Sequence, residues 1–125
     1  MYIIDGHNLL HAVYKIESEF QKVSDVDLCR FIGSFLKLTG QTGEIIFDGT
    51  GPRDKSIYDN IAGLEVFFSG IGTDTDTVIE DKIKADTAPK RLIIVSSDRR
   101  LRKAARARKA ASLKSEEFWF QINKQ

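Results

Sequence analysis

Short apolar runs alternate with longer amphipathic segments along this chain. Four of the runs are bounded by turn residues and are predicted to form strands: residues 2–4, 44–47, 64–68 and 91–95. Longer segments separate them, as expected when helices connect parallel strands. The pattern therefore predicts an α/β fold with a central, mainly parallel sheet.

Three of the longer segments are predicted to be helical. In the first, apolar residues follow the spacing of one helical face, Ser24 or Asp25 can cap its start, and Gly40 can end it. The second is predicted over residues 75–86, with a proline just beyond. The third, residues 98–108, is rich in alanine and arginine, which favour helix.

Two segments are harder to assign. Near the C-terminus, Phe118, Phe120 and Ile122 alternate as in a strand, whereas Ser115 followed by two glutamates is typical of a capped helix start. We expect a helix there. The pattern does not assign residues 9–20.

Length and composition indicate one compact domain. The chain has 125 residues, of which 42% are hydrophobic, so we expect a single domain, residues 1–125. The formal net charge of +1 means that any contact with a polyanion depends on local clusters of charge. The lone Cys29, expected to be a small buried hydrophobe, excludes an internal disulfide and a cysteine-based zinc cluster.

The chain shows no pattern of targeting or membrane insertion. Met1 leads at once into the first predicted strand, without the basic region of a secretory signal. No apolar run approaches the roughly 18 residues needed to cross a bilayer. We therefore expect a cytoplasmic protein that does not contact membranes.

Acidic residues follow the predicted strands. They are Asp5, Asp48, Asp74, Asp76 and Asp98. Because the carboxyl ends of parallel strands lie at one edge of a sheet, where ligands bind, these side chains are expected to converge. Converging carboxylates repel each other and raise one another's pKa, so a site that holds several of them normally contains a cation.

The ligand types favour a hard divalent ion. Oxygen ligands without His or Cys suit Mg²⁺ or Mn²⁺, not zinc. Such ions activate a water molecule and stabilise the charge of an in-line displacement at phosphorus. Glu80 lies one helical turn after Asp76 on the same face and is a further candidate ligand. These features predict the chemistry of a nuclease.

Each acid also has a structural alternative. Asp5 and Asp48 precede glycines and fit turns at the ends of strands. Asp74, Asp76 or Asp98 could cap the helix that follows. A metal site is favoured because four strands deliver acids to one edge.

Several motifs resemble one known family. Residues 2–8 (Tyr-Ile-Ile-Asp-Gly-His-Asn), 75–80 (Thr-Asp-Thr-Val-Ile-Glu) and 95–98 (Val-Ser-Ser-Asp) are similar to motifs of NYN domains, a branch of the PIN-like nucleases, and especially of the YacP-like group. Residues 114–118 are similar to the start of that family's closing helix. The resemblance implies a three-layer α/β/α PIN-like fold and metal-dependent endonucleolytic cleavage of RNA.

The resemblance also implies site residues. The matching positions are Asp5, Asn8, Asp76, Glu80 and Asp98. His7 stands where the family has tyrosine, and we expect it to pack or to support the site, not to bind metal. Residues 49–60 do not align with a family motif, which leaves the role of Asp48 open.

The helix predicted after Asp98 carries a cluster of positive charge. Its seven basic residues, with no acid among them, are Arg99, Arg100, Arg102, Lys103, Arg106, Arg108 and Lys109. An RNA backbone could track along this helix. The alternative is a solvated surface helix whose arginine stems cover the sheet.

Further residues are candidates for RNA contacts. Arg53 and Lys55, in the loop after the second strand, could bind phosphates from the other side. Tyr58 could stack on a base, although core packing is its expected role. The supporting residues, for which capping of strand ends is an equal alternative, are Thr73, Ser96 and Ser97.

The main hypothesis is a Mg²⁺- or Mn²⁺-dependent endoribonuclease that cleaves single-stranded RNA or mRNA, with RNA as its partner and the ribosome as a further candidate partner. Its proposed metal ligands are Asp5, Asp76 and Asp98, assisted by Asp48, Asp74 or Glu80, and Asn8 would fix the metal-bound water or the phosphate. A non-catalytic RNA- or ribosome-binding module is the alternative. A phosphohydrolase with Asp5 or Asp48 as nucleophile ranks last, because it lacks a second aspartate two residues on. The oligomeric state stays open.

Overall fold

Five parallel strands form one sheet, in the order β3-β2-β1-β4-β5. The computed structural model describes residues 1–17 and 23–124. The strands are β1 (Tyr2–Asp5), β2 (Gly43–Phe47), β3 (Leu64–Phe68), β4 (Ile93–Val95) and β5 (Ala111–Leu113). The first four were predicted from the sequence, which confirms the parallel α/β architecture. The short edge strand β5 was not.

The bounds of the strands follow from local chemistry. Strand β1 is buried along its whole length, which explains its continuous apolar sequence. Strand β4 begins two residues later than expected, because Pro89–Arg91 forms a 3-10 turn, η3, before it. Strand β5 pairs Ala111 with Ile93 of β4. Since β5 is three residues long and only weakly apolar, it depends on this pairing.

In the described part of the chain, five α-helices and the 3-10 turn η2 complete the fold. They are α1 (Gly6–Ile16), α2 (Asp25–Thr39), η2 (Ser56–Tyr58), α3 (Thr75–Ala85), α4 (Arg99–Ala107) and α5 (Ser115–Asn123). Ser24 caps α2 by accepting a hydrogen bond from the Asp27 N–H, and Gly40 ends it with a positive φ of 66°. Helix α5 confirms the helix expected at the C-terminus. The unassigned segment 9–20 is helical as far as Ile16, and its residues 18–20 lie outside the described residues.

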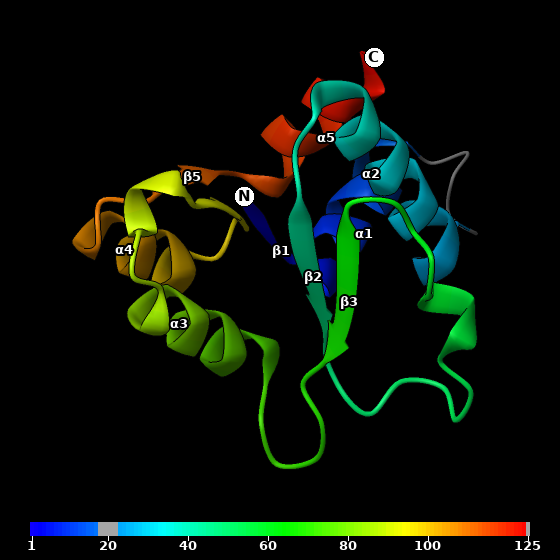
Figure 1. Ribbon diagram of the computed structural model, residues 1–125, viewed down its shortest axis with the longest axis horizontal. Coiled ribbons are helices and arrows are strands. Elements are labelled where there is room, and N and C mark those ends of the chain that lie inside the picture. Colours follow the sequence, from blue (N-terminus) through cyan, green and yellow to red (C-terminus); the bar gives the residue numbers. More distant parts are fainter. Residues whose placement is uncertain (18–22, 125) are drawn as a thin grey trace.

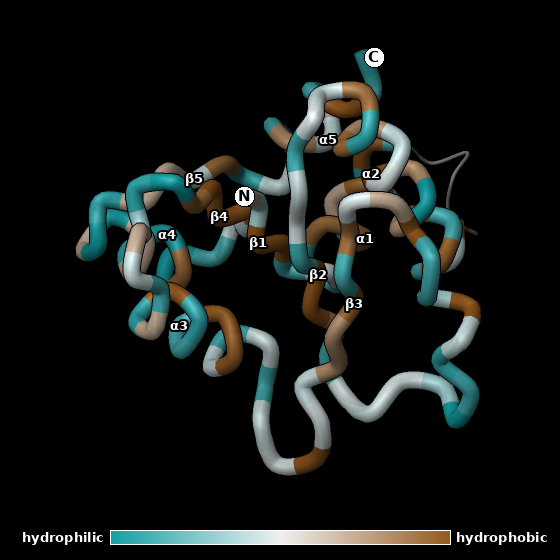
Figure 2. Tube along the Cα trace, viewed as in Figure 1, coloured by the Kyte–Doolittle hydropathy of each residue, from teal (hydrophilic) through white to brown (hydrophobic). Residues whose placement is uncertain are grey.

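The helices cover the sheet in two layers (Figure 1). Helices α1, α2 and α5 pack on one face, in a core that includes Ile4 and Cys29. Helices α3 and α4 pack on the other face against Ile3. Side chains alternate between the faces along a strand, so neighbouring residues of β1 serve both cores. Figure 2 shows the apolar strands between helices whose outer faces are hydrophilic.

Two further sequence expectations concern buried side chains. Cys29 is completely buried, as expected for a small hydrophobe. Tyr58 is 9% exposed and packs edge-on against Phe68, with ring centroids 5.3 Å apart, so core packing is its role. None of the helices in the described ranges is long and apolar enough to span a membrane.

The strand order places a crevice beside β1. From β1 the chain moves to β2 and β3 on one side, and then crosses to β4 and β5 on the other. In open parallel sheets, ligands bind outside the carboxyl ends of the strands where the order reverses in this way. Here that point lies between β1 and β4, which end beside Asp5 and before Asp98.

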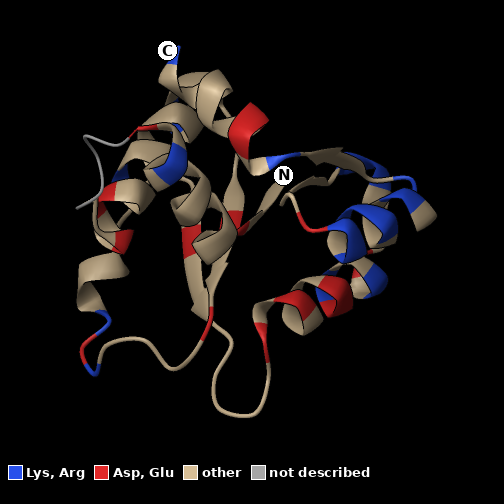
Figure 3. Cartoon of the chain, turned by 180° about the vertical axis from the view of Figure 1, so that it is seen from behind, with Lys and Arg blue, Asp and Glu red and all other residues tan. Residues whose placement is uncertain are grey.

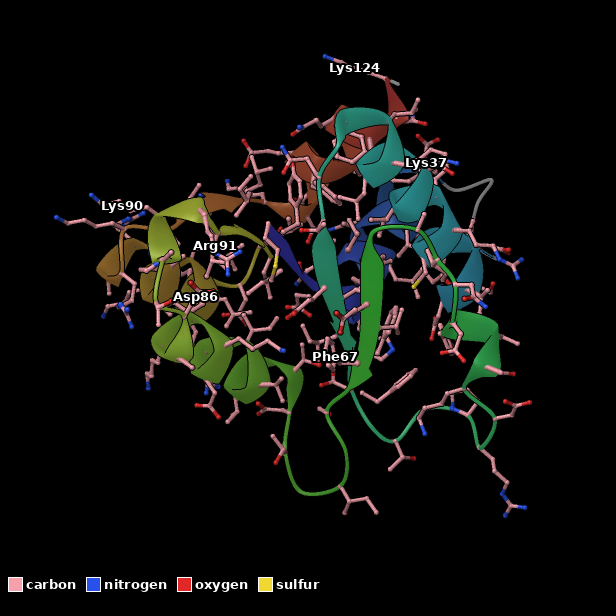
Figure 4. The ribbon with its side chains drawn as sticks, in the orientation of Figure 1. Lys37, Phe67, Asp86, Lys90, Arg91 and Lys124 are labelled. Atoms are coloured by element: carbon pink, nitrogen blue, oxygen red, sulfur yellow. The ribbon has the colours of Figure 1, made fainter. Side chains whose placement is uncertain are left out.

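The opposite edge of the sheet carries paired charges. There Arg91 forms an ion pair with Asp86 at 3.1 Å, and both are labelled in Figure 4. On the face of the sheet, Lys82 pairs with Glu44 at 2.9 Å and lies 4.1 Å from the centre of the Phe67 ring. These ion pairs and the ring contact lie away from the carboxyl edge of the sheet. The acids at that edge are therefore a separate group.

Candidate active site

The predicted acids meet at a cleft at the carboxyl edge of the sheet. The cleft has a volume of about 370 Å³ and is lined by Asp5, His7, Asn8, His11, Asp48, Asp74, Thr75 and Asp76. Five of these residues were predicted from the sequence as site residues. Asp98 adjoins Asp76 at the start of α4. In Figure 3, acidic residues gather on α3 and basic residues on the neighbouring α4.

Asp5 is held at the end of the central strand. Its side chain accepts a hydrogen bond of 3.0 Å from Ser96 Oγ, and Ser96 Oγ accepts one of 3.1 Å from the Asp98 N–H. Ser96 is completely buried and Asp5 is 7% exposed. Burial raises the pKa of the Asp5 carboxyl, and the Ser96 hydrogen bond opposes this rise. Ser96 thus ties the carboxylate of β1 to the turn after β4.

Helix α1 starts directly after Asp5 because Gly6 allows a close approach. A Cβ atom on Gly6 would lie 2.5 Å from the ring of Phe47 and 2.8 Å from the Ile46 carbonyl oxygen. Any larger residue would push the start of α1 away from β2. Glycine therefore keeps Asp5, His7 and the rest of the first helical turn against the sheet.

Asp76 and Asp98 form a closely spaced acidic pair. Burial raises the pKa of the Asp76 carboxyl to about 6, and repulsion from Asp98 and Asp5 and a side-chain hydrogen bond with Asp98 add to the rise. Asp98 also caps α4, because its Oδ1 accepts a hydrogen bond of 2.8 Å from the Arg100 N–H. The acids from β1, α3 and the β4–α4 turn are thus close enough to perturb one another.

Asp74 makes the helix-capping contact that the sequence offered as its alternative, whereas Asp48 bonds to the start of α3, a contact that the sequence did not predict. Asp48 Oδ1 accepts hydrogen bonds from the Thr75 N–H at 2.8 Å and the Thr75 hydroxyl at 2.6 Å. Asp74 Oδ1 accepts one from the Thr77 N–H at 2.8 Å. These bonds lower the pKa of both carboxyls. Both residues therefore anchor the start of α3 and still line the cleft.

His7 supports the rim of the cleft. Its Nδ1 accepts a hydrogen bond of 3.2 Å from the Asp48 N–H, and its ring packs edge-on against Phe47. Because Nδ1 is an acceptor in this bond, the ring proton lies on Nε2. The Asp48 carboxylate at 3.7 Å would form an ion pair only with a protonated ring, so we take the hydrogen bond as the contact that holds His7.

Arg100 lies between the acidic cleft and the basic helix. Its guanidinium forms an ion pair with Glu80, and also lies 3.9 Å from an oxygen of Asp76. It further donates a hydrogen bond of 3.4 Å to the Thr77 hydroxyl. Glu80, expected from the sequence to join the acids, is thus neutralised by Arg100. Arg100, expected to meet RNA, is engaged with the acids.

The other basic residues of α4 lie on a separate face. Arg99, Arg102, Lys103 and Arg106 line a hollow of about 490 Å³. The Arg102 Nε atom is buried and has no hydrogen-bond partner among the described residues. Arg108 is used differently, since it donates hydrogen bonds to the carbonyl oxygens of Lys84 and Asp86.

Three predicted RNA-contact or supporting residues lie outside the hydrogen-bonded site. Arg53 and Lys55 are exposed in the loop between β2 and η2, where Lys55 Nζ lies 5.7 Å from the centre of the Phe68 ring. Thr73 is exposed in the loop before α3. The structure therefore does not place these three residues next to the carboxylates of the cleft.

Thr75, His11, Ser115 and Glu116 belong to the site or its support and were not identified as such from the sequence. Thr75 carried a weak signal, as the first residue of a predicted helix. Ser115 hydrogen-bonds Asn8 at 2.6 Å across 107 residues of chain. No local pattern predicts a contact over that separation.

The fit of a metal ion depends on how many protein ligands it needs. Within residues 1–17 and 23–124, no group of three or more His, Cys, Asp or Glu side chains is arranged so that it could hold a metal ion. Mg²⁺, however, keeps several waters and typically uses one or two carboxylates together with substrate phosphates. Burial raises the pKa of the Asp5 and Asp76 carboxyls and repulsion from neighbouring acids adds to the rise, so a nearby cation would stabilise their charged forms. The donor atoms therefore fit an open Mg²⁺ or Mn²⁺ site, but not a closed protein cage.

Comparison with known proteins supports the fold. A crystal structure of Rae1 (YacP) from Bacillus subtilis has a TM-score of 0.75 and 16% sequence identity, and the match covers 99% of this chain and 74% of that one. A crystal structure of a tryptophan-to-leucine variant of Rae1 gives a TM-score of 0.74 at 16% identity, covering 98% and 74%. No curated protein sequence matches this chain significantly. At this identity the likeness shows the fold alone.

The sequence match is more specific than the likeness of folds. The model of a family described as the YacP-like NYN domain matches residues 2–125, from β1 beyond the end of α5. The three-layer fold and the resemblance stated from the motifs are thereby confirmed. The chain belongs to the YacP-like NYN domain family.

Proposed function

We propose that this protein is a Mg²⁺- or Mn²⁺-dependent endoribonuclease that hydrolyses phosphodiester bonds of single-stranded RNA. The observation that carries the proposal is the convergence of Asp5, Asp76 and Asp98 from three separate segments, where burial, and then repulsion from Asp98 and Asp5, raises the pKa of Asp76 to about 6. Such crowding is costly without a cation. Membership of the YacP-like NYN family, a branch of the PIN-like nucleases, supports the same conclusion.

The residues of the cleft have distinct roles in this proposal. Asp5, Asp76 and Asp98 would hold the ion, and Asp48, Asp74 and Glu80 would assist through their charge. A bound ion would supply an activated water and stabilisation of the charge at phosphorus. Ser96 keeps Asp5 aligned with the Asp98 backbone, and Ser97 would support the phosphate. Asn8 would contact the water or phosphate.

The hollow on α4 is the proposed path of the RNA backbone. Arg99, Arg102, Lys103 and Arg106 follow an i, i+3, i+4, i+7 spacing, so they share one face and extend about 10 Å from the acidic site. Arg102, whose buried Nε has no hydrogen-bond partner among the described residues, would bind a phosphate through its guanidinium group. Arg53 and Lys55 would bind phosphates beyond the other side of the cleft. The proposed substrate is RNA, as mRNA in the cytoplasm, and the ribosome is a partner to test. Residues 1–125 would act on it as one domain.

A second function remains supported by one feature of the site. Asp48, Asp74 and Asp98 all make helix-capping or turn contacts, and the described residues contain no closed metal cluster. A non-catalytic RNA-binding module on the same fold would use the basic hollow alone. Its RNA affinity would fall with salt and would not respond to chelation.

The test compares the wild-type chain with Asp5→Asn, Asp76→Asn and Asp98→Asn on end-labelled single-stranded and structured RNAs. Asp81→Asn, an exposed acid on α3, is the matched control. We expect Mn²⁺-dependent cutting that EDTA stops, loss of at least about 100-fold in the three variants, and wild-type activity in the control. No cutting of either RNA by the wild type, with Mn²⁺ binding unaffected by Asp76→Asn, would contradict the proposal.

A further inference from the structure

The side-chain amide of Asn8 is fixed by two hydrogen bonds. Its Oδ1 accepts a bond of 3.0 Å from the Ser97 N–H and one of 2.6 Å from the Ser115 hydroxyl. A backbone N–H can only donate, so the atom that faces it must be the amide oxygen. The orientation of the Asn8 amide therefore follows from the chain itself.

This orientation decides which atom of Asn8 is available to a ligand. Both acceptor sites of Oδ1 are used by Ser97 and Ser115, which leaves the Nδ2 hydrogens as the free group. Asn8 lines the acidic cleft together with Asp5 and Asp76. An amide nitrogen does not ligate a cation but donates hydrogen bonds to anionic oxygen atoms. A donor among carboxylates in this cleft suits a phosphate oxygen.

Ser115 reaches Asn8 from the C-terminal helix, which packs on the same face of the sheet as α1. It is the first residue of α5 and is completely buried. Its own N–H donates a hydrogen bond of 3.0 Å to Ser97 Oγ, and Ser97 Oγ donates one of 2.9 Å to Glu116 Oε2. The first turn of α5 is thus bonded both to Asn8 and to the β4–α4 turn that carries Asp98.

We propose that Ser115 is a positioning residue that holds the Asn8 amide with its NH₂ group toward the scissile phosphate of RNA. This inference rests on the proposed nuclease function and assigns Asn8 to the phosphate, which was one of the two contacts proposed above, and not to the water. Helix α5 packs in the core with α1 and α2. Through Ser115 it also takes part in the site. Loss of the Ser115 hydroxyl leaves Oδ1 with one bond and lets the amide rotate.

The first experiment tests the role of Asn8. Asn8→Asp replaces the NH₂ group with an oxygen of nearly equal size. We expect it to reduce kcat about 100-fold, like Asn8→Ala, because a donor to the transferring phosphate is lost. Mn²⁺ affinity, measured by calorimetry without RNA, should be unchanged or higher in Asn8→Asp. Full activity in Asn8→Asp would identify position 8 as a metal ligand and overturn the inference.

The second experiment tests the role of Ser115. We expect Ser115→Ala to lower kcat about tenfold and to leave KM and Mn²⁺ affinity unchanged. A tenfold loss is the lower end of the range for removal of a partner that orients a site residue. In an Asn8→Ala background the same change should have no further effect on kcat, because the residues act as one unit. A purely structural serine would lower activity by the same factor in both backgrounds, and that result would overturn the inference.

Two measurements keep the inference separate from folding and from the nuclease function. Ser34→Ala, an exposed helical serine, is the control for a lost hydroxyl. In EDTA and low salt, the Asn8 NH₂ resonances should shift when single-stranded RNA is added to the wild type, and should not shift in folded Ser115→Ala. If the Asn8 resonances shift in a wild type that does not cut RNA, the result would support the inference and contradict the nuclease function. An active wild type without the shift would contradict the inference alone.

Discussion

Replacement of Asp76 by asparagine should stabilise the protein when no divalent ion is present. The Asp76 carboxyl has a pKa raised to about 6 in the folded chain, from an ordinary value of 3.8. Because the folded value is the higher one, ionisation opposes folding, and the penalty grows from about pH 3.8 upward until it is complete above about pH 6. Asparagine removes this penalty and can still donate a hydrogen bond to Asp98. The gain in the free energy of unfolding should therefore depend on pH.

The size of the gain follows from the pKa. A rise from 3.8 to about 6 corresponds to about 3 kcal/mol at most. Since the pair faces an open cleft and Arg100 lies 3.9 Å from Asp76, solvent screening reduces this to about 1 kcal/mol. For a domain of this length, that is a rise in Tm of about 3 to 6 °C. At pH 3 the carboxyl is largely protonated in both the folded and the unfolded chain and resembles the amide, so the gain should nearly vanish.

The assay is urea unfolding in EDTA at pH 3 and pH 7.5, followed by circular dichroism. Wild type, Asp76→Asn and the control Asp81→Asn are compared at both pH values. Millimolar Mg²⁺ at pH 7.5 should then stabilise the wild type more than Asp76→Asn, because only an ion that binds the folded state raises stability. Equal destabilisation of Asp76→Asn at both pH values would refute the reasoning. It would mean that the effect of the substitution does not depend on the ionisation of the Asp76 carboxyl.

Three other substitutions test separate parts of the structure. Gly6→Ala should lower the free energy of unfolding by about 1 to 3 kcal/mol in urea, because the new methyl group meets the Phe47 ring, and an unchanged midpoint would contradict the packing described. Arg102→Gln should weaken binding to single-stranded RNA and reduce the slope of log K against log salt by about 0.7, whereas an unchanged slope would exclude a phosphate contact there. Thr75→Val should raise the pKa of the Asp48 carboxyl, measured by carbon NMR. Since the lowered pKa of Asp48 favours folding only above its unfolded value, the stability lost in Thr75→Val should be greater at pH 7 than at pH 3.

Local sequence determined the elements that carry the acids. Strand β1 is buried on both faces of the sheet, so it had to be a continuous apolar run, and the run ends in Asp5. Ser24 and Gly40 determined the ends of α2 through capping and a left-handed residue, both of which act within a few residues. The rule that parallel strands end at one edge then predicted that Asp5, Asp76 and Asp98 would converge.

Other features depend on neighbours that the sequence does not reveal. Strand β5 exists because β4 offers it an edge to pair with, and its three residues carry too little pattern to predict it. Glu80 has the correct helical spacing to join Asp76, yet the approach of α4 gives it Arg100 as its partner. Asp48 could have been a turn residue or a ligand, and the position of Thr75 made it an anchor for α3.

The sequence by itself determined which residues could carry metal-dependent chemistry, because residue type, burial and strand ends are local properties. Only the tertiary structure decided how those residues are used. Ion pairs, shared protons and the orientation of an amide depend on atoms within a few ångströms that come from distant parts of the chain. The contact between Ser115 and Asn8, over 107 residues of sequence, is the clearest instance.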